Sequence, residues 1–90
     1  MTDDEITATI LRLAVLVEND ETSRAVLSTN ERIAVALVLD RKDWLEQMSW
    51  SILAAIDRLG EEWFRATQRA WMIRREGRPW LIHASDRKTD

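Results

Sequence analysis

Few side chains in this sequence could support acid–base, nucleophilic or metal chemistry. His83 is the only histidine and cysteine is absent, so a catalytic triad could be built only through a residue near the C-terminus. Asp57 and Glu61 are spaced to share a helix face, but no Glu-x-x-His motif accompanies them, which favours solvated charges over metal ligands. The sequence also lacks a nucleophile elbow and a phosphate-binding glycine loop. We therefore expect no enzyme, catalytic residue, metal site, cofactor or small-molecule substrate.

Recognition is the chemistry that the remaining residues favour, because the chain carries 5 tryptophans in 90 residues. At about 100° per residue, a helix over residues 43–76 would place an aromatic stripe beside its main apolar face. This stripe contains Trp50, Leu53, Phe64 and Trp71. It could pack against another helix of the same domain, or form an exposed patch of about 500 Å². We predict a protein-interaction face, with Trp50 and Trp71 contributing more to association than to folding.

The charge distribution suggests an alternative function. Residues 1–64 carry a net charge of −7 and residues 65–90 a net charge of +4, which add to the total of −3. Basic residues favour helix C-termini, which explains much of this asymmetry. Arginines interleaved with tryptophan could instead bind nucleic acid by phosphate pairing and base stacking. The residues of this alternative site are Arg74, Arg75, Arg78 and Trp80, although the chain's pI near 5.1 is unusual for such a protein.

These side chains must be positioned by helices. Two glycines, one proline, 46% hydrophobic and 32% charged residues indicate a globular, helix-rich chain, and 90 residues correspond to one domain. We predict an all-α bundle of three to four helices in a single domain, 1–90, with a C-terminal tail at 77–90. The predicted helices span about 3–18, 29–40, 43–59 and 61–76.

Capping signals support the helix starts. Ser28 and Glu31 form a capping-box pattern before the apolar run 33–39, and Asp43 with Glu46 predicts a second cap. The run 33–39 has the length and β-branched content of a buried strand, but the cap and the absence of a partner strand favour a buried helix. A short helical turn is expected at 22–27, after a first helix whose wide apolar face predicts a central position.

Gly60 decides between two architectures. A heptad pattern of apolar residues runs from Leu45 to Ile73 without losing phase, as in one continuous helix over 43–76 of about 50 Å. A break at Gly60 would instead make Glu61 and Glu62 the first-turn acids of a last helix. We favour the break. In either case we predict a core, drawn from the apolar faces of several helices, that includes Leu13, Val17, Leu37, Ile52, Ile56 and Trp63.

The location and partners follow from what the sequence contains. The N-terminus is acidic where a signal peptide would be basic, and the longest apolar run has seven residues where a membrane span needs about 20. We therefore expect a cytoplasmic protein with no membrane partner. The predicted function is a non-enzymatic interaction module that binds a protein, with a second copy of itself as the favoured partner. An adaptor, an antitoxin-like protein and a phage-borne inhibitor fit this pattern equally well.

Overall fold

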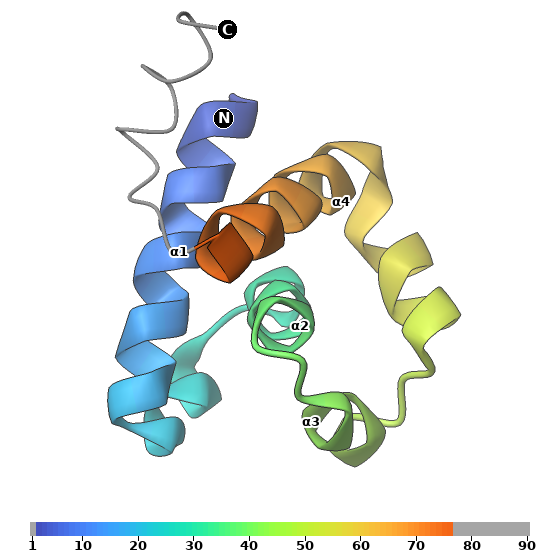
Figure 1. Ribbon diagram of the computed structural model, residues 1–90. Coiled ribbons are helices and arrows are strands. Elements are labelled where there is room, and N and C mark those ends of the chain that lie inside the picture. Colours follow the sequence, from blue (N-terminus) through green and yellow to red (C-terminus); the bar gives the residue numbers. More distant parts are fainter. Residues whose placement is uncertain (1, 77–90) are drawn as a thin grey trace, which may run out of the picture.

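A computed structural model describes residues 2–76 of the chain, and within this range it consists of helices joined by short turns, with no strand (Figure 1). The all-α prediction is therefore confirmed, while the predicted tail, 77–90, lies outside the described residues. The elements in chain order are α1 (Asp3–Asn19), the 3₁₀ helix η1 (Glu21–Val26), α2 (Thr29–Val38), α3 (Lys42–Gln47) and α4 (Ile52–Glu76).

The first two α-helices begin at capping boxes. Thr2 and Glu5 exchange hydrogen bonds between side chain and backbone N–H at 2.9 and 3.2 Å, and the bond that the Thr2 N–H donates to the Glu5 carboxylate lowers the pKa of that carboxyl. The predicted box of Ser28 and Glu31 is confirmed, with equivalent bonds of 2.8 and 3.2 Å. The predicted cap at Asp43 is wrong. Arg41 precedes α3 without a side-chain cap, and Asp43 instead accepts two hydrogen bonds from Arg41.

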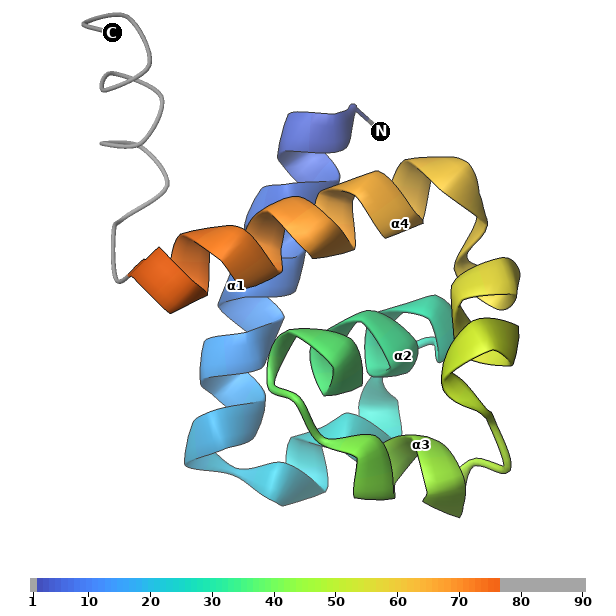
Figure 2. The ribbon, with the colours of Figure 1, turned by 45° about the vertical axis from the view of Figure 1, so that its right-hand side comes forward.

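Helix α2 is the central element of the fold. Ile33 to Ala36 are four consecutive residues with at most 1% of their surface exposed, so side chains on all sides of this helix are buried. α2 packs against α1, α3 and α4, which surround it in Figures 1 and 2. The preference for a helix over a strand at 33–39 is confirmed. The central position predicted for the first helix is wrong, because Val15 and Leu16 on α1 are exposed.

The predicted helix 43–59 is wrong, because α3 ends at Gln47 and α4 begins at Ile52. Ser49 adopts a left-handed conformation with φ of 65°. Its N–H donates to the Glu46 carbonyl, and the Trp50 N–H donates to the Leu45 carbonyl, both at 2.9 Å. These bonds form a Schellman motif, which ends a helix. Asp40, with φ of 57°, ends α2 in the same way.

The predicted break at Gly60 is confirmed, because this residue interrupts the helical backbone of α4. Its φ of 79° and ψ of 169° are non-helical, and the helix changes direction there (Figure 2). The alternative of one continuous helix over 43–76 is wrong on two counts, because the chain is interrupted both at Gly60 and between α3 and α4. The Cα radius of gyration of 13.0 Å is close to the value of about 12 Å for a compact domain of this length.

The core prediction is largely wrong for the same reason. Among the six named core residues, Val17 is fully buried, whereas Leu13, Leu37, Ile56 and Trp63 are half-buried and Ile52 is 44% exposed. For Ile52, Ile56 and Trp63 the cause is that a heptad pattern assigns one face to a straight helix, whereas two direction changes rotate the later positions relative to the earlier ones. Small residues, including Ala55, Ala66 and Ala70, are fully buried instead and allow close packing of α4.

Ion pairs join the acidic and basic ends of the chain. Arg65 lies 3.2 Å from Asp3, and Arg69 lies 2.6 Å from Asp4, so two arginines of α4 neutralise the first turn of α1. Each of these pairs is partly exposed to solvent, and such pairs contribute little to stability individually. The charge asymmetry of the sequence is thus partly compensated within the fold.

Candidate interaction surface

Two apolar side chains are exposed at the start of α4, and the local backbone structure explains their exposure. Ser51 Oγ accepts a hydrogen bond from the Ala54 N–H at 3.2 Å, which caps the new helix after the left-handed turn at Ser49. Ile52 and Leu53 therefore occupy its first turn, where they are 44% and 79% exposed. Neighbouring Trp50 is half-buried and packs against the core. The turn thus packs Trp50 against the core and leaves Ile52 and Leu53 exposed to solvent.

An apolar groove lies beside Ile52. It has a volume of about 200 Å³ between the end of α2, the start of α3 and the start of α4. Its apolar lining is Ala36, Leu37, Leu45 and Ile52, and we call it the Ile52 groove. Asp40, Arg41 and Lys42 complete the lining with charged side chains. An apolar hollow with a charged rim is the usual composition of a recognition site.

The charges around the groove differ in their pairing. Arg41 lies 2.8 Å from Asp43, and this pairing lowers the pKa of the Asp43 carboxyl. Asp40, Lys42 and Asp57 are exposed and take part in none of the ion pairs formed within residues 2–76. Asp57 lies four residues after Leu53 and therefore on the same face of α4. Lys42 and Asp40 thus lie at the groove without an ion pair, and Asp57 lies beside the exposed leucine.

The predicted aromatic stripe does not lie along one helix. Trp50 lies in the turn before α4, Leu53 follows in the first turn, and Phe64 and Trp71 come after the change of direction at Gly60. Trp50 and Trp71 pack against the core, Phe64 is half-buried, and Leu53 alone of the four is mostly exposed. The 100° rule failed here because it assumes a continuous helix.

The residues of the nucleic-acid alternative are only partly described. Arg74 lies 2.6 Å from Glu18 of α1, and the Arg75 guanidinium lies 4.8 Å from the centre of the Trp71 ring. Arg78 and Trp80 lie outside the described residues. The two described arginines therefore both have partners within the domain.

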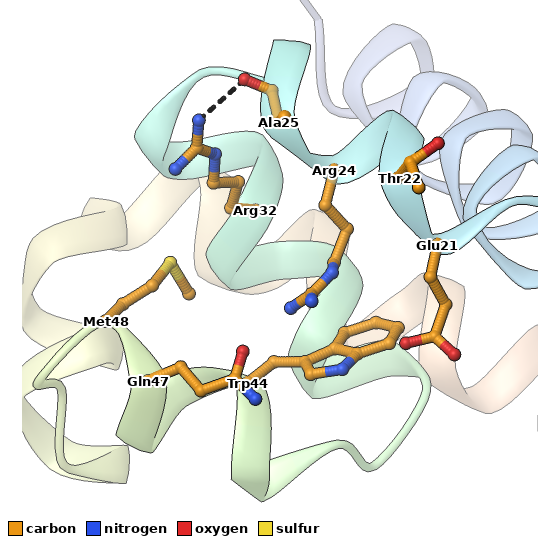
Figure 3. A pocket seen from close by; sticks show the side chains of 8 residues that line it. All are labelled: Glu21, Thr22, Arg24, Ala25, Arg32, Trp44, Gln47 and Met48. Carbon is orange, nitrogen blue, oxygen red and sulfur yellow. Dashed lines mark hydrogen bonds between the residues drawn. The ribbon is translucent and has the colours of Figure 1, made fainter.

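Sequence reasoning missed the surroundings of Trp44. This side chain is only 2% exposed, and the guanidinium carbons of Arg24 and Arg41 lie 4.2 and 4.1 Å from its ring centre. It lines a cleft together with Arg24 and Arg32 (Figure 3). Arg41 is close to Trp44 in sequence and could have been anticipated, but Arg24 precedes it by 20 residues. No spacing rule links residues so far apart.

No helix within residues 2–76 has both the length and the apolar character needed to cross a bilayer. In the same range, no group of three or more His, Cys, Asp or Glu side chains is placed to hold a metal ion. The chain matches no protein-family model, no curated protein and no solved structure.

Proposed function

We propose that this chain is a non-enzymatic interaction module that pairs with a second copy of itself through the start of α4. The observation that carries this proposal is the position of Leu53, which is 79% exposed in the turn that also carries Ile52 of the groove. A protruding apolar side chain next to an apolar hollow is self-complementary. A two-fold axis near Ile52 would seat the Leu53 of each copy in the Ile52 groove of the other.

The dimensions of the groove support this pairing. Its volume is about 200 Å³, and cavities of about 150 Å³ hold a benzene molecule. An inserted leucine side chain would contact Leu37 and Leu45 and would lose its exposed apolar surface to the partner. This contact is small beside the roughly 800 Å² per partner of a standard interface, so the self-association should be weak and reversible.

Two of these unpaired charges, Lys42 and Asp57, support the same register. In a two-fold pair, Lys42 at the rim of one groove faces the α4 helix of the partner, which carries Asp57 next to Leu53. Opposite charges at the rim of an interface mainly orient the partners and accelerate encounter. The pairing would therefore place Lys42 of each copy close to the partner's Asp57.

Molecular mass measured by light scattering across a concentration series tests the proposal. The mass of the unmodified chain should rise with concentration, while Leu53→Asp should remain a monomer because the carboxylate would lose its hydration against the apolar lining of the groove. Val26→Asp is the matched control, because Val26 is 83% exposed but lies in η1. A monomeric unmodified chain at all concentrations, or equal association of Leu53→Asp and the unmodified chain, would contradict the proposal.

A charge exchange tests the register. Lys42→Glu should weaken association by opposing the partner's Asp57, and adding Asp57→Lys should restore it. Failure of the second change to restore association would rule out this register. If the chain instead binds single-stranded nucleic acid in a salt-sensitive way, and alanine at Arg74, Arg75 and Arg78 abolishes that binding, the alternative function is supported.

A further inference from the structure

The Trp44 cleft is a second candidate site, separate from the surface at the start of α4. It has a volume of about 340 Å³ and is lined by residues of η1, α2 and α3, among them Glu21, Arg24, Arg32, Trp44, Gln47 and Met48 (Figure 3). This volume lies at the lower end of the range for small-molecule sites, about 300 to 1,000 Å³. None of these residues lines the Ile52 groove.

Arg24 is the unusual residue of this cleft. Its side chain reaches from η1 to the face of Trp44, with the guanidinium carbon 4.2 Å from the ring centre (Figure 3). Within residues 2–76, its buried Nε has no hydrogen-bond partner and no carboxylate forms an ion pair with its guanidinium. The cation–π contact offsets part of the cost of holding a cation there, but leaves its hydrogen-bonding capacity unused.

The neighbouring arginines do not share this property. Arg41, which lies over the same indole, is neutralised by Asp43 through two hydrogen bonds of 3.0 and 2.8 Å. Arg32 donates to the Leu27 and Ala25 carbonyls at 3.1 and 2.8 Å, so its position is fixed by the backbone. Because the Nε of Arg24 is buried, its two Nη groups are the donors that Arg24 can offer to a ligand in the cleft.

The charges of the cleft indicate the class of ligand. Arg24 and Arg32 supply two positive charges and Glu21 one negative charge, which suits a ligand with a single negative charge better than a phosphate dianion. The planar guanidinium pairs with a planar carboxylate through parallel hydrogen bonds. Ala25, Met48 and the edge of Trp44 supply apolar surface beside it.

We propose that the Trp44 cleft binds a small organic carboxylate, with the carboxylate on Arg24 and its apolar group against Met48. Sodium benzoate, which combines these two features, is a suitable probe. Titration followed by ¹⁵N–¹H NMR at constant ionic strength should give saturable shifts of the Trp44 indole and Gln47 amide resonances. Benzamide has the same shape without the charge and should give no saturable shift, and inorganic phosphate should bind more weakly than benzoate.

Variants separate this site from general anion binding. Arg24→Met keeps an aliphatic chain over the indole and should weaken benzoate binding by about tenfold or more, because the charge-assisted hydrogen bonds are lost. Arg12→Met is the control, because Arg12 is exposed on α1 and this substitution removes the same charge away from the cleft. Equal affinity of the Arg24→Met and unmodified chains overturns the proposal. Equal shifts with benzamide, or no saturable shift in the unmodified chain, overturn it without reliance on any variant.

Discussion

At the scale of single residues, Gly60 has the strictest backbone requirement in the described part of the chain. Its φ of 79° and ψ of 169° lie in a region that is essentially accessible only to glycine. A Cβ atom at this position would meet nothing within 4 Å, so the restriction is one of backbone conformation and not of space.

Gly60→Ala should therefore destabilise the domain by about 1 to 3 kcal/mol, the cost of a strained backbone conformation. Urea denaturation followed by circular dichroism measures this change. A single continuous helix would give the opposite sign, since alanine is favoured over glycine by about 1 kcal/mol in a helix interior. An increase in stability would thus show that the helix runs straight through residue 60.

At the scale of elements, the end of α3 determines which apolar side chains reach the surface. The Schellman motif at Ser49 turns the chain so that Trp50 packs against the core and Leu53 points into solvent. A non-glycine residue in the left-handed conformation costs about 1 to 2 kcal/mol. The motif is retained because its two hydrogen bonds satisfy the last carbonyls of α3.

Ser49→Gly should stabilise the domain by about 0.5 to 1 kcal/mol. Glycine adopts this conformation without strain, and its greater loss of freedom on folding offsets only part of that gain. Ser49→Val should do the reverse, since a β-branched residue is a clear outlier at positive φ. Thermal melting of the two variants side by side tests this pair. If valine melts at the same temperature as glycine, Ser49 does not hold a left-handed turn.

At the scale of the whole molecule, stability depends on the burial of α2 between its three neighbours. Ile33 is fully buried, and Ile33→Ala should cost about 2 to 5 kcal/mol through lost burial and a residual cavity. That is a large part of the roughly 5 to 15 kcal/mol by which a domain is stable.

Ile52→Ala removes the same atoms from a side chain that is 44% exposed and should cost much less. Chemical denaturation at low protein concentration compares the two variants without a contribution from self-association. Equal costs would mean that the start of α4 is buried as deeply as α2, which would contradict this packing.

The sequence by itself determined the helical class, the starts of α1 and α2, the helical state of 33–39 and the break at Gly60. Each of these features depends on residues within about four positions of one another, through capping bonds, periodicity and the conformational freedom of glycine. The start of α1 predicted near residue 3 is confirmed, and Thr2 and Glu5 form there the same capping box as Ser28 and Glu31 do at the start of α2.

Only the tertiary structure decided where α3 ends, which apolar residues are buried and that Arg24 lies over Trp44. Ser49 is not a typical left-handed residue, and its turn is stabilised by bonds and packing that depend on the surrounding fold. Once the chain turns there and again at Gly60, a heptad pattern no longer identifies the buried face. The approach of Arg24 to Trp44 joins residues 20 positions apart, and such a contact follows from the arrangement of helices in space and not from local sequence.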